Sequence, residues 1–176
     1  RNTLAAAAMA MVSGIPASVI AHTLRTFQGV EHRIEFVREL DGVRFINDSK
    51  GTNVDSTIQA VRAMKRPTVL ILGGYDKHCD FEPLVRVIKE NPIEHIVLIG
   101  ATANQIAQTL DTCGYDAYEH CGTDFPAAVR RSFELAAPGW NVLFSPSCAS
   151  FDMFTDYESR GRIFKQLVNG MEGGGA

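Results

Sequence analysis

Hydrophobic and polar positions follow two different patterns along the chain, and the change falls near residue 34. Residues 2–11 are rich in alanine, leucine and methionine, which favours a helix. Gly14 ends this helix, and Pro16 suits the first turn of a second helix that continues to Leu24. The two helices carry few polar positions, so we expect their apolar faces to pack against another part of the protein.

Beyond residue 34 the pattern becomes one of short strands. Residues 34–40 alternate apolar and polar side chains, Asp41-Gly42 is typical of a tight hairpin turn, and residues 43–47 form the returning strand. Short apolar runs then alternate with helical segments to residue 168. We expect further strands at residues 68–72, 95–99, 117–119 and 141–144, and helices at residues 54–64, 81–91, 103–112, 124–135 and 157–168.

The later strands, such as residues 69–72, are apolar at every position, as expected when helices cover both faces of a sheet. The pattern therefore predicts an α/β fold: a Rossmann-like, doubly wound, mostly parallel sheet with an N-terminal β-hairpin and a short preceding α-hairpin. We divide the chain into residues 1–31, a helical remnant and linker; residues 32–169, the α/β domain; and residues 170–176, a Gly-rich flexible tail. Because Arg1 opens the chain, we expect a fragment of a longer protein.

Composition narrows the classes of partner. Apolar residues make up 45% of the chain and charged residues 21%, and the net charge of -3 gives no electrostatic reason to expect nucleic acid or an anionic membrane. No stretch approaches the ~20 apolar residues of a membrane span. The four cysteines form no CxxC pair, which argues against a zinc site or a disulfide framework. We expect a cytoplasmic monomer without a metal site in this chain.

Candidate chemistry lies in the loops that follow the strands, because ligands of open α/β sheets bind beyond the carboxyl ends of the strands. Lys50 and Lys77 stand in two of these loops, beside the N-termini of the following helices. Their ammonium groups would reinforce a site for phosphate or carboxylate, although either lysine could simply be solvated. Asp48 could bind ribose hydroxyls or a metal, or cap a helix.

The linker carries a further candidate for anion binding, and two common nucleotide-binding motifs are absent from the sequence. His32-Arg33 lies at the junction of the two parts of the chain and suits a phosphate contact. The sequence contains neither a GxxxxGK[ST] phosphate loop nor a GxGxxG fingerprint. The residues by themselves therefore indicate an α/β domain that binds a small anion at the ends of its strands.

Four segments resemble the motifs of one enzyme family. Residues 45–53, FINDSKGTN, resemble the NDSKATN signature of the D-glutamate-adding members of the Mur ligase family. His32-Arg33 resembles the linker motif of that family, residues 73–77 its GGxxK loop, and residues 145–154 its SPACAS-type segment. The four motifs occur in the family's order, and the resemblance extends over about residues 2–168.

This resemblance implies the C-terminal domain of a three-domain, ATP-dependent amide ligase of peptidoglycan precursor synthesis. Residues 1–31 would end the central ATPase domain, which holds most of the contacts to ATP and Mg²⁺. In the implied reaction, the terminal carboxylate of UDP-N-acetylmuramoyl-L-alanine is phosphorylated, and the amine of D-glutamate displaces the phosphate. The chain alone is expected to be inactive, since it lacks the phosphate loop.

The resemblance also implies roles for single residues. The implied catalytic residues are Lys50 and His32; the ATP contacts are Asn2, Arg33, Asp48 and Lys50; the D-glutamate contacts are Thr52, Lys77, Ser150, Phe151 and Tyr157. Three positions depart from the usual motifs, and one of them, Ser147, replaces a common alanine. Gly51 replaces an alanine, which we expect only to loosen the loop, and Tyr157 replaces a phenylalanine, which adds a hydroxyl near the proposed carboxylate site.

Other interpretations remain open. The chain could be the C-terminal domain of another Mur-superfamily amide ligase or of a folylpolyglutamate synthase, against which Lys50 in its NDSK context argues. A nucleotide-binding oxidoreductase domain is disfavoured by the missing GxGxxG. A non-catalytic α/β module that binds anions or protein partners would leave the two strand-end lysines unexplained.

Overall fold

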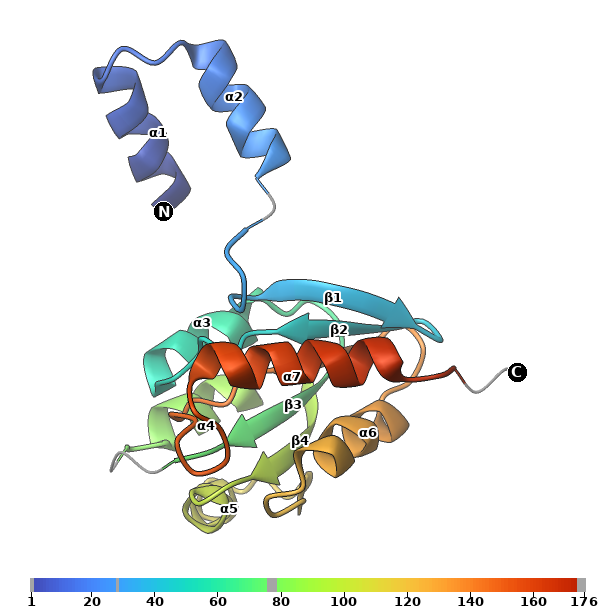
Figure 1. The fold of residues 1–176 in the computed structure, drawn as a ribbon. Helices are drawn as coiled ribbons and strands as arrows, with labels where there is room; N and C mark the ends of the chain where they lie inside the picture. Colours follow the sequence, from blue (N-terminus) through green and yellow to red (C-terminus); the bar gives the residue numbers. More distant parts are fainter. Residues whose placement is uncertain (1, 28, 76–78, 174–176) are drawn as a thin grey trace. The chain divides into compact units, whose positions relative to one another are not determined.

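A computed structural model describes residues 2–27, 29–75 and 79–173 of the protein (Figure 1). The chain divides into two compact units, Arg1–Val30 and Glu31–Ala176. The first unit consists of helices α1 (Asn2–Val12) and α2 (Ala17–Thr26). Pro16 caps α2 instead of lying in its first turn. Many large apolar side chains of this unit are exposed: Leu4, Met9, Met11, Val12, Val19 and Leu24.

The second unit is built on a six-stranded sheet. Strands β1 (Glu35–Leu40) and β2 (Val43–Asn47) form an antiparallel hairpin, and the left-handed φ angles of Asp41 and Gly42, 48° and 78°, match the expected turn. Four strands continue the sheet in parallel: β3 (Thr68–Gly73), β4 (Ile93–Ile99), β5 (Tyr118–His120) and β6 (Asn141–Phe144). The strand order is β1-β2-β6-β3-β4-β5, so β6 lies between β2 and β3.

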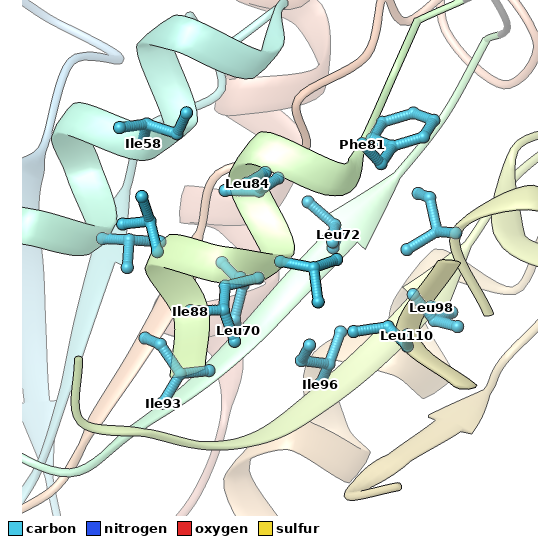
Figure 2. Close-up of a cluster of buried hydrophobic side chains, with 14 of the residues drawn as sticks. Ile58, Leu70, Leu72, Phe81, Leu84, Ile88, Ile93, Ile96, Leu98 and Leu110 are labelled. Carbon is cyan, nitrogen blue, oxygen red and sulfur yellow. The ribbon is translucent and has the colours of Figure 1, made fainter. Parts of the chain in front are cut away.

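Helices cover both faces of this sheet: α3 (Val54–Ala63), α4 (Glu82–Lys89), α5 (Ala103–Thr112), α6 (Phe125–Leu135) and α7 (Tyr157–Gly170). Successive side chains of a strand point to opposite faces. Leu70 and Leu72 of β3 therefore pack with α3, α4 and α5, and Figure 2 shows this cluster. Val69 and Ile71 pack with α6 and α7, the helix that runs across the sheet in Figure 1. The predicted doubly wound, mostly parallel α/β fold is confirmed.

The boundaries differ from the sequence pattern at two places. Ile34 was expected to begin the first strand, but it has a φ of 46° and donates its N–H to Oδ1 of Asp48 (3.1 Å), so β1 begins at Glu35. At the other end α7 reaches Gly170, and the partly buried Met171 packs against the core. Residues 170 and 171 are therefore not part of a frayed tail.

Candidate functional site

Polar loops meet at one edge of the sheet. Strands β2, β6, β3 and β4 are consecutive, parallel neighbours, so their carboxyl ends lie side by side. Backbone hydrogen bonds join the loops that follow them: Gly73 N–H donates to Pro146 O (2.9 Å), and Tyr75 N–H donates to Ala149 O (3.0 Å). The described parts of the loops after β3 and β6 therefore lie together at this edge of the sheet.

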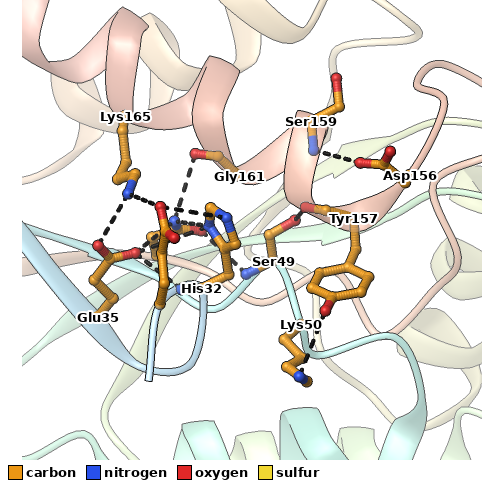
Figure 3. A network of polar contacts seen from close by, with 11 residues as sticks. His32, Glu35, Ser49, Lys50, Asp156, Tyr157, Ser159, Gly161 and Lys165 are labelled. Carbon is orange, nitrogen blue, oxygen red and sulfur yellow. Dashed lines mark hydrogen bonds and ion pairs between the residues drawn. The ribbon is translucent and has the colours of Figure 1, made fainter. Parts of the chain in front are cut away.

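Lys50 lies half-buried in the loop after β2. Its Nζ lies 3.5 Å from Oη of Tyr157, the first residue of α7, and 5.3 Å from the centre of that ring. Figure 3 shows the two side chains pointing toward one another. Ser49 ties the same two segments together, since its Oγ donates to the Tyr157 carbonyl (2.8 Å). Among the ion pairs of the described residues none involves Lys50, so its ammonium is open to an anionic ligand.

Asp48 is buried directly beneath this loop. Its Oδ2 accepts a hydrogen bond from Ser145 Oγ (2.6 Å), and its Oδ1 accepts from Ile34 N–H (3.1 Å). A Cβ on Gly51 would lie 2.6 Å from that Oδ2 and 2.7 Å from Ser145 Oγ, well inside van der Waals contact. The expectation that Gly51 only loosens the loop is therefore wrong: glycine leaves room for the hydrogen-bonded pair.

Burial raises the pKa of Asp48 from 3.8 to about 6, although the bonds from Ser145 and Ile34 act to lower it. The stability that the protonated carboxyl provides is thus complete below its unfolded-state pKa and is lost as the pH rises through about 6. We expect Asp48→Asn to remove this loss. Its unfolding free energy should gain roughly 2 kcal/mol over wild type between about pH 4 and pH 7, as measured by urea denaturation.

A second variant checks the same electrostatics. Ser145→Ala removes a donor that lowers the pKa of Asp48, so the loss of stability should extend to higher pH than in wild type. Parallel pH profiles for wild type and Asp48→Asn would contradict the assignment.

His32 is buried, with 3% of its surface exposed, between the linker and α7. Asn47 Nδ2 donates to its Nδ1 (2.9 Å), which leaves the ring proton on Nε2, and burial lowers the pKa of His32, so the ring is neutral. Glu35 accepts the His32 backbone N–H (3.0 Å) and a bond from Asn47 Nδ2 (3.0 Å). In Figure 3 the ring lies close to Gly161 of α7. These contacts are those of a residue that positions its neighbours.

The linker itself has an unusual backbone. His32 and Ile34 have φ angles of 63° and 46°, a left-handed region that side chains other than glycine rarely adopt. The bonds to Glu35 and Asp48 hold them there, while Arg33 between them is exposed. Lys165 of α7 adds ion pairs to Glu31 (2.6 Å) and Glu35 (3.1 Å). Figure 3 shows Lys165 and Glu35 facing one another.

The loop after β6 carries the other predicted ligand residues. Ser150 is buried, and its carbonyl accepts the N–H groups of Met153 (3.1 Å) and Phe154 (2.8 Å) in a single turn. The backbone N–H groups of Ser150 and Phe151 donate to no described residue, so they remain available to a carboxylate. The Phe151 side chain is 66% exposed and stacks edge-on against Tyr75.

The other three predicted ligand residues lie in different parts of the chain. Thr52 is half-buried in the Lys50 loop, where its N–H donates to the Lys50 carbonyl (2.8 Å). Asn2 begins α1 in the first unit. Lys77 lies outside the described residues. The structure thus brings together Lys50, Thr52, Ser150, Phe151 and Tyr157 at one edge of the sheet.

One residue of the site has no counterpart in the sequence prediction. Arg160 is completely buried and bonds to the loops after β2 and β6. The signal was present, because Arg160, Phe164 and Val168 follow one another at intervals of four, which places them on one face of α7. An arginine on the apolar face of an amphipathic helix indicates that its side chain is buried and hydrogen-bonded inside the protein.

The arrangement can bind anions and orient them. It offers the Lys50 ammonium, the exposed Arg33 guanidinium and free backbone N–H groups, which fit phosphate or carboxylate oxygens. Among residues 2–27, 29–75 and 79–173, no three His, Cys, Asp or Glu side chains are grouped to hold a metal ion. Within the same residues no helix has the length and apolar character needed to cross a membrane. The cationic and N–H groups at this edge thus suit the oxygens of an anionic ligand.

Comparison with known proteins gives the same family as the motifs. Residues 32–148 match the profile described as Mur ligase, glutamate ligase domain. A UDP-N-acetylmuramoylalanine–D-glutamate ligase of Thermoanaerobacter sp. (strain X514) is 51% identical over 169 residues, which are 95% of this chain and 37% of that protein. The ligase of the same name from Caldicellulosiruptor saccharolyticus is 49% identical, over 96% of this chain and 37% of that protein. The chain thus spans 37% of the length of these relatives.

Solved structures share the fold at low identity. The UDP-N-acetylmuramate–alanine ligase of Thermotoga maritima has a TM-score of 0.70 at 15% identity and covers 97% of this chain and 37% of its own. A bifunctional folylpolyglutamate synthase/dihydrofolate synthase of Yersinia pestis has a TM-score of 0.61 at 16% identity, over 87% and 34%. The profile match, the relatives and the shared fold agree, and the chain therefore belongs to the Mur ligase family.

Proposed function

We propose that this chain is the C-terminal domain of a cytoplasmic, monomeric ligase that joins D-glutamate to UDP-N-acetylmuramoyl-L-alanine at the expense of ATP. ATP phosphorylates the terminal carboxylate of the nucleotide substrate. The D-glutamate amine then attacks the acyl phosphate, and phosphate leaves as the amide forms. This chain contributes the amino-acid site, and the contacts to the uridine nucleotide lie elsewhere in the protein.

The observation that carries this proposal is the convergence of unpaired cationic and N–H groups at one sheet edge. D-Glutamate brings two carboxylates, and negative charge develops during phosphoryl and acyl transfer. Lys50 and the free N–H groups of Ser150 and Phe151 offer the complementary donors on two neighbouring loops. The relatives that are 49–51% identical carry the name of the D-glutamate ligase, whereas the alanine ligase and the folylpolyglutamate synthase share only the fold at 15–16% identity.

Within this proposal the residues divide into two groups. D-Glutamate binds to Thr52, Lys77, Ser150, the backbone at Phe151, and Tyr157. ATP binds to Asn2, Arg33, Asp48 and Lys50, with Mg²⁺ held mainly by the central part of the protein. Lys50 is the catalytic residue that stabilises charge on the transferring phosphoryl group. For His32 the buried, neutral ring favours a positioning role over proton transfer.

The substrate assignment can be tested with the complete protein that contains this chain. Phosphate release is measured with ATP, UDP-N-acetylmuramoyl-L-alanine and, in turn, D-glutamate, L-glutamate, D-aspartate and L-alanine. The proposal predicts release with D-glutamate alone. Release with L-alanine and the unaminated uridine nucleotide, or with L-glutamate and a folate, would assign the chain to another ligase of the family.

Lys77→Ala tests the carboxylate role of the second strand-end lysine. We expect the KM for D-glutamate to rise at least about tenfold and the KM for ATP to change less than about twofold, since a charge-assisted bond to one carboxylate is lost. Steady-state kinetics of the complete protein measures both constants. Lys89→Ala, which removes an exposed lysine of α4, is the control and should alter neither. Equal effects on both substrates would refute the role of Lys77.

A further inference from the structure

Arg160 projects from the first turns of α7 into the protein interior, where none of its surface is exposed. Its guanidinium donates hydrogen bonds to two loops. Toward the loop after β2, Nε donates to Ser49 Oγ (3.0 Å) and Nη2 to Ser49 O (2.8 Å). Toward the loop after β6, Nη1 donates to the carbonyls of Cys148 (3.1 Å) and Ala149 (3.0 Å), and Nη2 also reaches Cys148 O (3.1 Å).

This buried charge has no carboxylate partner in the described part of the chain, because none of its ion pairs involves Arg160. One face of the guanidinium lies 5.6 Å from the Phe144 ring. Asp152 attracts it electrostatically, but its Oδ2 accepts the Ala101 N–H (3.0 Å). Burial lowers the pKa of Arg160 to about 10, so the group stays charged at neutral pH. An unpaired charge in the interior is costly, and its retention calls for a reason.

The partners of the guanidinium supply that reason. Ser49 immediately precedes Lys50, and Cys148-Ala149 immediately precede Ser150 and Phe151. The guanidinium therefore ties the segment that presents the ammonium to the segment that presents the free N–H groups. Only a planar fork with five donors can serve both loops at once, which a lysine ammonium cannot reproduce.

The positive charge of Arg160 also attracts an anionic ligand. In the low dielectric of the interior a positive group acts over a longer range than it does in water. Arg160 lies directly behind both loops, where the carboxylates of the amino acid are proposed to bind. An anionic ligand there would add to the weak attraction of Asp152 and compensate a charge that forms no ion pair among the described residues.

We propose that Arg160 is the positioning residue of the amino-acid pocket: it sets the Lys50 loop against the Ser150 loop and supplies the positive charge that favours a dicarboxylate. This inference rests on the proposed function for the identity of the ligand. The hydrogen bonds between α7 and the two loops stand independently of it.

The test uses Arg160→Gln and Arg160→Lys in the complete protein, with Val168→Ala as control. Val168 is a buried core residue two turns further along α7, so its truncation is expected to destabilise the domain at a distance from the bonds that Arg160 makes. We expect Arg160→Gln to raise the KM for D-glutamate about tenfold or more, with a smaller change for ATP, because bonds from a charged donor are lost. Arg160→Lys, which keeps the charge, should recover part of this loss, and Val168→Ala should change neither KM.

A second readout needs no substrate. Hydrogen exchange should accelerate at the amides of Lys50, Gly51, Tyr75 and Phe154, which bond within or onto the two loops, in Arg160→Lys but not in Val168→Ala. Strand β4, which pairs with β3 on one side and β5 on the other, should keep its protection in both variants. If Arg160→Gln does not fold, Ser49→Ala removes one acceptor of the guanidinium and should give the same local acceleration.

The outcomes separate the two proposals. If wild type shows no D-glutamate-dependent phosphate release but the exchange changes are confined to the two loops, the proposed function fails and the positioning role of Arg160 holds. If the Gln, Lys and Val168→Ala variants alter both KM values alike, Arg160 serves only global stability and the inference is overturned. A folded Arg160→Gln with wild-type KM for D-glutamate overturns it as well.

Discussion

Lys50→Met in the complete protein is expected to lower kcat about 10²- to 10³-fold, the range found when one preorganised donor to a developing negative charge is removed. The Lys50 ammonium forms no ion pair within the described chain, and its Nζ lies against the hydroxyl and ring of Tyr157, whose carbonyl accepts a bond from the neighbouring Ser49. It is therefore oriented before any ligand binds, so little reorganisation accompanies the reaction. Methionine keeps the length and packing of the side chain but removes the charge.

Steady-state phosphate release measures this effect, and thermal unfolding shows whether the variant is folded. The matched control is Lys65→Met, which removes an exposed lysine that donates to the Arg62 carbonyl (3.2 Å) and should leave kcat unchanged. A Lys50→Met enzyme with an unchanged kcat and a raised KM would show that Lys50 binds substrate without assisting the chemical step.

Gly161→Ala should destabilise the domain by roughly 2–3 kcal/mol, the upper part of the range for overpacking a filled interior. A Cβ at this position would overlap Nδ1 of His32 and lie 2.8 Å from its Cε1 and 2.9 Å from its Cγ. The ring cannot simply move aside, because Asn47 bonds to it (2.9 Å) and its backbone is fixed by Glu35 (3.0 Å). The clash outweighs the gain of about 1 kcal/mol that alanine normally brings to a helix.

Urea denaturation of the variants provides the measurement. Gly170→Ala is the internal control, since a Cβ there meets nothing within 4 Å in the same helix and should be neutral or slightly stabilising. Combining Gly161→Ala with His32→Ala should relieve the overlap. The double variant should therefore lose less unfolding free energy than the sum of the two single variants, by at least about 1 kcal/mol. Additive effects would mean that the ring and the helix do not press on each other.

The candidate site was predictable where the motif and the strand ends coincide. Lys50, Thr52, Ser150, Phe151 and Tyr157 were all placed by resemblance, and the structure brings them to one edge of the sheet. The partners that hold them were not predictable from their positions in the chain. Arg160 is 111 positions from Ser49, and Asp48 is 97 positions from Ser145. Contacts at such separations leave no periodic pattern, because they depend on which strands become neighbours.

Residue patterns alone predict the order of the elements and a sheet with helices on both faces. Alternating apolar strands and amphipathic helices leave one way to bury both faces, and Asp41-Gly42 permits one tight turn. The position of β6 between β2 and β3 became evident in the folded chain, where it brings the Lys50 and Ser150 loops together. The same holds for Arg160 behind these loops and for the Asp48–Ser145 pair beneath Gly51. Hydrophobic patterning indicates whether a side chain is buried, but the partners of a buried polar group come together only once the chain has folded.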